Sequence, residues 1–298
     1  MHALDLATSW PVDHVSIAVL QRNLEAPQAA AQITTSGDPD RTYRLASLAK
    51  PITAWATLIA VEEGLLQLDA PIGQPGCTLR HLLSHAGGYA FDGDRPISPP
   101  GKRRIYSNTG IEMAAAAVAA AADMPFGQYL TEAVLQPLGM ESTTLRGSPA
   151  HAMYSNVADM CRFVDELITP RLVSAETAAM AVLPVFPQLS GIVPGVGRYE
   201  HCSWGLGFEV KGNKVLHWMG TTNSSRAFGH FGGAGTFVWV DLGVARHRAL
   251  ACVALTDRPF DEWAAQALVL WPQLSDAVIA QSLTVPASPG SIAGEADS

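Results

Sequence analysis

The chain has 298 residues, of which 48% are hydrophobic and 15% charged, so it can bury the core of one large domain or of two closely packed ones. Its formal net charge is −8 without any basic tract, and we expect neither a nucleic-acid partner nor attraction to an anionic membrane. No cationic segment followed by an apolar run opens the sequence, and no apolar stretch could span a bilayer, so we expect a cytoplasmic location and no membrane span.

The first segments alternate between strand and helix patterns. His14–Gln21 is β-branched and apolar and predicts a strand, with Ala31–Thr35 as its hairpin partner. The apolar-periodic run Ile52–Glu63 predicts a helix that ends at Gly64.

From Thr78 to about Leu183 the pattern predicts an almost entirely helical region. Segments rich in proline and glycine separate five candidate helices: Thr78–His85, Thr109–Met124, Phe126–Leu138, Asn156–Thr169 and Ala175–Leu183. The following stretch, Pro184–Cys202, is irregular, and a loop of that length usually borders a site.

After this loop the pattern alternates with the period of strands. We predict four successive antiparallel strands and a final helix over Gly205–Val210, Lys214–Trp218, Gly235–Asp241, Arg248–Thr256 and Asp261–Ser282. The expected fold is therefore α+β, an antiparallel sheet flanked by helices and built from both chain ends. Residues 1–64 and 184–283 would form the sheet domain, residues 65–183 an inserted helical subdomain, and residues 284–298 a disordered tail.

The four cysteines stand apart along the chain. Without a CxxC pair, we expect buried free thiols in a reducing compartment rather than a disulfide or metal site; the residues are Cys77, Cys161, Cys202 and Cys252.

Lys50 is the lysine that lies within an apolar run, whereas Lys102, Lys211 and Lys214 occur in polar, turn-like sequence. Desolvation lowers the pKa of an ammonium toward the range of a useful base. Ser47 precedes Lys50 by three residues and shares its helix face, and Pro51 is tolerated only in a first helical turn. The pattern predicts a nucleophile and a base at a helix N-terminus that can stabilise an oxyanion.

Two further segments carry suitable chemistry. Tyr106 could act as a base near a lysine, and Asn108 could bond a substrate amide. In Gly229–Gly233, just before a predicted strand, His230 would supply a polar wall that can carry positive charge, and the N–H of Gly233 a second oxyanion donor.

Each motif alone also has an ordinary structural interpretation. Ser47 could be a helix cap and Lys50 a surface lysine. Tyr106 could be a buried anchor before a capped helix, and the glycines could simply open a hairpin.

Taken in order, the three motifs resemble the SxxK, YxN and HxG (or KTG) motifs of class C serine β-lactamases, penicillin-binding D-alanyl peptidases and family VIII esterases. The resemblance covers roughly Val15 to Thr256. The intervening stretches that look like this family are Thr42–Ala54, Val61–Ile72, Thr78–Gly88, Ile105–Gly110, Gln136–Thr143, Trp204–Val210 and Phe228–Gly232.

The resemblance implies a β-lactamase/transpeptidase-like fold and an acyl-enzyme reaction on a small-molecule ester or amide, without a cofactor or metal. Ser47 would be acylated, Lys50 and Tyr106 would take its proton and return it to the leaving group, and water would release the acyl group. The implied substrate-binding and oxyanion residues are Asn108, His230, Gly232 and Gly233, with the N–H of Ser47 as the other oxyanion donor.

Three departures from the family pattern favour a carboxylesterase. His230 and Phe231 replace the lysine-threonine pair of most β-lactamases, which weakens recognition of a β-lactam carboxylate. The intervals between motifs are short, which implies a more open pocket, and no export signal is seen. The alternatives are a β-lactamase or D-alanyl-D-alanine carboxypeptidase, and a catalytically silent ligand-binding relative.

His81 and His85 offer a competing metal hypothesis, since histidines at i and i+4 on a helix can share a metal. Leu82 follows His81 where a glutamate would be expected, and no third ligand is evident. We expect both histidines to be packed and hydrogen-bonded instead.

Overall fold

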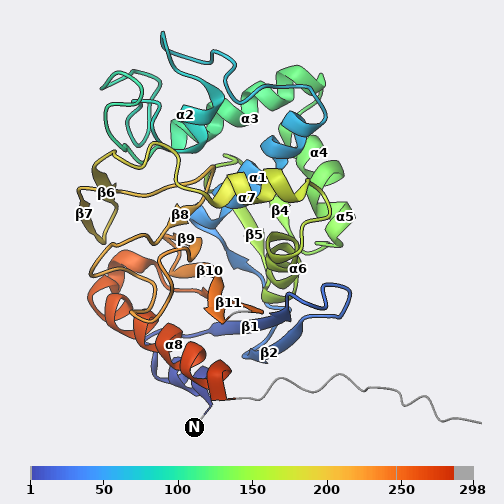
Figure 1. Ribbon diagram of the computed structural model, residues 1–298, viewed down its shortest axis with the longest axis vertical. Helices are drawn as coiled ribbons and strands as arrows, with labels where there is room; N and C mark the ends of the chain where they lie inside the picture. Colours follow the sequence, from blue (N-terminus) through green and yellow to red (C-terminus); the bar gives the residue numbers. More distant parts are fainter. Residues whose placement is uncertain (1, 246, 285–298) are drawn as a thin grey trace, which may run out of the picture.

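A computed structural model of the chain describes residues 2–245 and 247–284. Its main feature is a six-stranded antiparallel sheet in the order β2-β1-β11-β10-β9-β8, with helices on both faces (Figure 1). The predicted α+β class is confirmed. The division into a sheet domain and a helical subdomain stays a prediction, as does the disordered tail, of which residues 285–298 lie outside the described residues.

Both ends of the chain build the centre of this sheet. β1 (Val15–Asn23) pairs with β2 (Gln32–Ser36) on one side and with β11 (Arg248–Thr256) on the other. The expected hairpin partner of the first strand is therefore present. β10 (Thr236–Ala245) continues the sheet beside β11.

The far side of the sheet differs from the sequence prediction. β9 (Phe228–Gly232) is a strand, so the third motif lies on a strand of the sheet and leads into the turn to β10, where Gly233 lies. β8 is short, Glu209–Val210. The strand predicted over Lys214–Trp218 is absent from the described structure, because Lys214 and His217 turn inward to contact Glu209.

Alternation along the strands divides the core into two layers. In β1, Ile17 and Val19 belong to a cluster formed with α8 (Ala264–Thr284) and η1 (Ala3–Ser9). Ala18 and Leu20 belong to a second cluster, which includes buried residues of α1 (Ala49–Glu62) and α6 (Val157–Ile168). This period of two is the signature of a strand buried on both faces.

The middle of the chain is less helical than predicted. Its helices and turns are α2 (Leu79–Leu83), α3 (Asn108–Ala122), α4 (Phe126–Leu130), the π-helical turn η3 (Thr131–Leu135), α5 (Gln136–Leu138) and α7 (Ala175–Val182). A small sheet in the order β3-β5-β4 joins Tyr43–Arg44, Met153–Ser155 and Thr144–Leu145.

Irregular backbone near the site is held by a buried arginine. Arg104 donates to the carbonyls of Ser84, Val185, Phe186 and Cys202, so these carbonyl groups are satisfied without regular structure. Within the stretch predicted to be irregular, a short hairpin forms between β6 (Gly191–Val193) and β7 (Gly197–Tyr199).

All four cysteines are buried and free. Among the described residues, no helix combines the length and the apolar character needed to cross a bilayer.

Candidate active site

Ser47 lies where the chain passes from β3 into α1. It sits in the 3₁₀ turn η2 (Ala46–Leu48), which runs directly into α1, and is preceded by Ala46 with a φ of 48°. A positive φ is unusual for alanine and is commonly found where structure around a functional group enforces it. The turn leaves Ser47 partly exposed while its neighbours Ala46 and Leu48 are buried.

The ammonium nitrogen of Lys50 is fully buried and has three oxygen partners. Nζ lies 2.9 Å from Ser47 Oγ, 2.6 Å from Asn108 Oδ1 and 3.0 Å from the carbonyl oxygen of Ala150. Burial lowers the Lys50 pKa to about 7, although Glu112 and Asp92 act in the opposite direction. A neutral amine can keep its two N–H donors on Asn108 and Ala150 and direct its lone pair at the Ser47 hydroxyl.

Asn108 is engaged at both ends of its amide. Oδ1 accepts from Lys50, and Nδ2 donates to Asp92 Oδ1 at 2.9 Å. With a side chain that is almost fully buried, Asn108 orients Lys50 in this structure rather than presenting a free amide to a substrate. The preceding Ser107 caps α3 by accepting from the N–H of Gly110. The segment therefore both caps a helix, through Ser107, and supplies Tyr106 and Asn108 to the site.

Tyr106 brings a phenol to the same cavity. Its ring packs 4.5 Å from that of His85 and 5.7 Å from that of Trp204, and Lys50 Nζ lies 4.8 Å from the centre of the Tyr106 ring. Desolvation raises the pKa of Tyr106 far above its ordinary value, and a hydrogen bond with Ser47 offsets only part of this effect. The structure therefore favours the neutral phenol over a phenolate.

His230 faces Tyr106 as a neutral ring. Its Nδ1 lies 2.6 Å from the carbonyl oxygen of Phe231, which can only accept, so Nδ1 carries the proton. Nε2 then accepts from the Tyr106 hydroxyl at 3.3 Å. Burial and the nearby Lys50 lower the His230 pKa to about 3. The interpretation of His230 as a wall that can carry positive charge is therefore wrong.

The two glycines after His230 differ in their surroundings. A Cβ at Gly232 would lie 2.2 Å from the carbonyl oxygen of Leu45, so only glycine lets β9 approach the segment before Ser47. A Cβ at Gly233 would meet no atom within 4 Å. Gly233 therefore borders open space next to Ser47, where a substrate acyl oxygen could lie.

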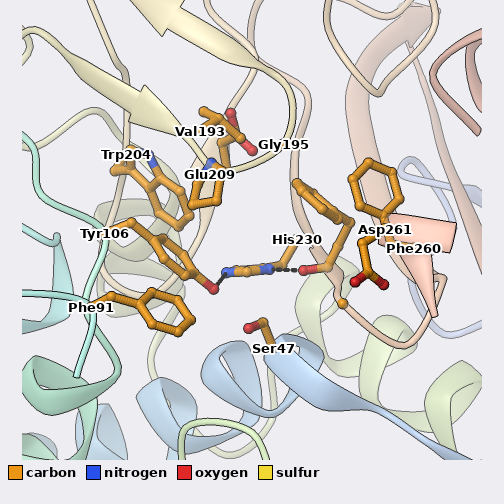
Figure 2. A pocket seen from close by; sticks show the side chains of 13 residues that line it. Ser47, Phe91, Tyr106, Val193, Gly195, Trp204, Glu209, His230, Phe260 and Asp261 are labelled. Carbon is orange, nitrogen blue, oxygen red and sulfur yellow. Dashed lines mark hydrogen bonds between the residues drawn. The ribbon is translucent and has the colours of Figure 1, made fainter. Parts of the chain in front are cut away.

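These groups surround one cavity of about 250 Å³, seen in close-up in Figure 2. Ser47, Tyr106, His230 and Gly233 all line it. Its other lining residues are Phe91, Val193, Pro194, Gly195, Trp204, Glu209, Phe231, Phe260 and Asp261. The structure thus brings together the hydroxyl, the phenol and the histidine, with the Lys50 amine directly behind Ser47.

Comparison with known proteins gives this arrangement a family. The family model described as Beta-lactamase matches residues 15–269. The chain belongs to the beta-lactamase family. The resemblance seen in the three sequence motifs is therefore confirmed.

Curated members of the beta-lactamase family match this chain only in part. The D-alanyl-D-alanine-carboxypeptidase/endopeptidase AmpH of Escherichia coli is 27% identical over 160 residues, 40% of this chain and 41% of AmpH. Penicillin-binding protein 4* of Bacillus subtilis is 27% identical over 157 residues, 40% of this chain and 35% of that protein. The matched segments thus span well under half of either relative.

Solved structures match nearly the whole chain. A beta-lactamase from Mycobacterium bovis has a TM-score of 0.87 and 44% identity, covering 94% of this chain and 98% of that one. The simvastatin synthase LovD of Aspergillus terreus has a TM-score of 0.72 at 16% identity, with 91% of each chain covered, and shows the shared fold alone.

One buried charge network of this family member was missed from the sequence. Glu209 lies 3.2 Å from Lys214 Nζ, 2.9 Å from His217 Nε2 and 2.7 Å from Trp218 Nε1. Burial alone would raise the Glu209 pKa, but these partners outweigh it and hold the pKa far below its ordinary value. Lys211 and Lys214, which occur in polar, turn-like sequence, are both buried.

The two histidines of the metal hypothesis do not share a helix face. α2 ends at Leu83, and His85 has a φ of 56°. His81 Nδ1 bonds the Thr78 hydroxyl at 2.8 Å, and His85 Nδ1 accepts from the N–H of Ser107 at 3.2 Å. Within residues 2–245 and 247–284 no group of three His, Cys, Asp or Glu could hold a metal ion.

Proposed function

We propose that this member of the beta-lactamase-like serine hydrolases is a carboxylesterase that forms an acyl-enzyme at Ser47. The observation that carries the ester preference is the lining of the cavity. It is dominated by aromatic and apolar side chains, and none of its described lining residues is a lysine or arginine.

Substrates of the two alternative activities, β-lactamase and D-alanyl-D-alanine carboxypeptidase, carry a carboxylate. β-Lactams and peptides ending in D-alanine both present this group, and recognition of a carboxylate ordinarily uses a cationic side chain. Here the equivalent third motif offers the neutral His230, and the cavity wall adds the acidic Asp261. An uncharged ester suits such a wall better than an anionic amide.

The proposed acylation begins at the contact between Lys50 and Ser47. The neutral amine of Lys50 accepts the Ser47 proton, and Oγ attacks the ester carbonyl. The N–H groups of Ser47 and Gly233 stabilise the oxyanion. As the tetrahedral intermediate collapses, the Tyr106 phenol gives its proton to the departing alkoxide, and the Lys50 ammonium replaces that proton on Tyr106.

Deacylation uses the same groups in reverse. The Lys50–Tyr106 pair removes a proton from a water molecule, and the resulting hydroxide attacks the acyl carbon. Ser47 Oγ leaves and recovers its proton from Lys50, while the carboxylic acid departs. Between these proton transfers His230 holds the Tyr106 hydroxyl in position by accepting its hydrogen bond.

A substrate panel tests the proposal. Rates are measured on p-nitrophenyl butyrate, a chromogenic cephalosporin and a peptide ending in D-Ala-D-Ala, with Ser47→Ala as the control. We expect measurable ester hydrolysis that is lost in the variant, and slow or no turnover of the other two. Faster turnover of the β-lactam or of the peptide would overturn the ester preference.

The peptidase alternative is kept because AmpH of Escherichia coli bears the name of a D-alanyl-D-alanine carboxypeptidase. A silent ligand-binding relative is the other alternative, and it predicts no turnover of any member of the panel. The cytoplasmic location expected from the sequence stays a prediction.

A further inference from the structure

Asp261 is an acidic side chain in an otherwise apolar region of the cavity wall. It belongs to the 3₁₀ turn η4 (Phe260–Glu262), which brings Phe260 and Asp261 to the cavity. In Figure 2 its carboxylate lies beside the Phe260 ring, on the side of the cavity opposite Tyr106. Within residues 2–245 and 247–284, no hydrogen bond or ion pair engages this carboxylate.

The other charged groups nearby are compensated within the protein. Glu209 also borders the cavity, but Lys214, His217 and Trp218 satisfy its carboxylate. Arg258 is the cation closest to Asp261 in sequence, and it pairs with Glu262 at 3.4 Å while donating to the carbonyl of Pro11. Asp261 therefore gives the cavity one uncompensated negative charge.

Aromatic rings next to Asp261 suit a cation of low hydration. The rings of Phe231 and Phe260 lie 5.1 Å apart and both line the cavity, whereas Trp204 and Phe91 line it on the side of Tyr106 (Figure 2). A quaternary or alkylated ammonium gains from the faces of such rings as well as from a carboxylate, whereas a carboxylate on the substrate would be repelled.

We propose that Asp261 selects ester substrates that carry an ammonium group, with the rings of Phe231 and Phe260 completing the cation site. This inference rests on the proposed esterase function and specifies its substrate class. Asp261 acts as a specificity-determining residue for the reaction at Ser47.

The test compares esters that differ only in charge. One set varies the charge of the leaving group: butyrylthiocholine is cationic, its carbon isostere 3,3-dimethylbutyl thiobutyrate is neutral, and the thiobutyrate of 3-mercaptopropionate is anionic. A second set varies the charge of the acyl group in p-nitrophenyl esters: 4-(trimethylammonio)butyrate is cationic, 5,5-dimethylhexanoate is neutral, and glutarate is anionic. The measured quantity is the ratio of kcat/KM for the cationic ester to that for its neutral isostere.

We expect this ratio to be about fivefold or more in at least one set, as for a partly exposed ion pair assisted by aromatic rings. The anionic ester should be the poorest of its set. Asp261→Asn should bring the ratio to about one, and Asp261→Glu should retain most of it. Glu141→Gln, which removes an exposed charge outside the cavity lining, should leave the ratio as in the wild type.

A ratio near one in both sets, or a preference that survives in Asp261→Asn, would overturn the proposal while leaving the esterase function intact. Binding measurements test the cation site even if the wild type hydrolyses no ester. Calorimetry with Ser47→Ala and the intact esters measures affinity without turnover. Tighter binding of the cationic ester to Ser47→Ala, lost in Ser47→Ala/Asp261→Asn, supports the cation site. Equal binding of cationic and neutral esters to Ser47→Ala would contradict it.

Discussion

The hydroxyl of Tyr106 donates to Nε2 of His230 across 3.3 Å, and this contact fixes the state of both side chains. Since Nδ1 of His230 already donates to the carbonyl of Phe231, the ring has a lone pair only at Nε2. Tyr106 must then supply the proton of the shared hydrogen bond. Tyr106 is therefore held as an acid whose hydroxyl borders the cavity, and Lys50 is the group that can act as the base.

Removal of the phenol hydroxyl should therefore impair proton transfer without disturbing packing. Tyr106→Phe keeps the ring contacts with His85 and Trp204, and we expect kcat for ester hydrolysis to fall by about 10²–10⁴-fold, the usual range for a lost general acid or base. Tyr43→Phe is the matched control, because it removes a buried hydroxyl that bonds Ser16 instead. Equal losses in the two variants would rule out a specific role for Tyr106.

The pH profile of kcat/KM should report the titration of Lys50. Because the neutral amine is the proposed base and its pKa is lowered to about 7 by burial, activity should decline as pH falls below about 7. Asp92 raises this pKa, so Asp92→Asn, which can still accept from Asn108, should move the acidic limb to lower pH. Glu141→Gln, at an exposed position outside the cavity lining, should leave the limb unchanged. A shift to higher pH in Asp92→Asn would contradict the assignment.

The two glycines of the third motif should respond differently to alanine. Gly232→Ala places a Cβ within 2.2 Å of the Leu45 carbonyl and should lower the free energy of unfolding by about 1–3 kcal/mol or more. Gly233→Ala meets open space and should fold with nearly wild-type stability, while its methyl group intrudes where the acyl oxygen is proposed to bind. Thermal unfolding and ester kinetics measured on both variants separate these effects. Comparable destabilisation by both substitutions would refute the difference in packing.

Stability should depend on pH through Glu209. Its pKa is lower in the folded protein than the ordinary 4.5, so the network stabilises the fold fully above that value and loses the contribution as pH falls below it. Glu209→Gln would leave Lys214 buried without its counterion, and we expect a loss of about 3–5 kcal/mol in the free energy of unfolding at neutral pH. Chemical denaturation of both proteins between roughly pH 3 and pH 7 measures the effect. A wild-type stability that stays constant below pH 4.5 would exclude the network as its source.

Local relationships could be predicted from the sequence, whereas long-range ones could not. Ser47 and Lys50 lie three residues apart, so helix geometry alone pairs them. The contacts of Lys50 with Asn108 and of Tyr106 with His230 span 58 and 124 residues, and only the fold brings these side chains together. The motifs indicated which residues carry the chemistry, but not that Asn108 is engaged at both ends or that His230 is neutral.

The network of Glu209 was missed for a related reason. Lys211-Gly212-Asn213 has the composition of a turn between two strands, and such a composition gives no sign of a buried charge. One signal was available: Glu209 stands between the apolar Phe208 and Val210, with Lys214 and His217 within eight residues of it. A carboxylate in such a run requires buried partners.

The most direct test of the central claim is covalent labelling of Ser47. The protein is incubated with a fluorophosphonate, and intact and peptide mass spectrometry locate the adduct. We expect one adduct per chain at Ser47 in the wild type, none in Ser47→Ala, and strongly slowed labelling when Lys50 is replaced by methionine. A wild-type protein that remains unmodified, or that is labelled at another residue, would contradict the assignment of Ser47 as the nucleophile.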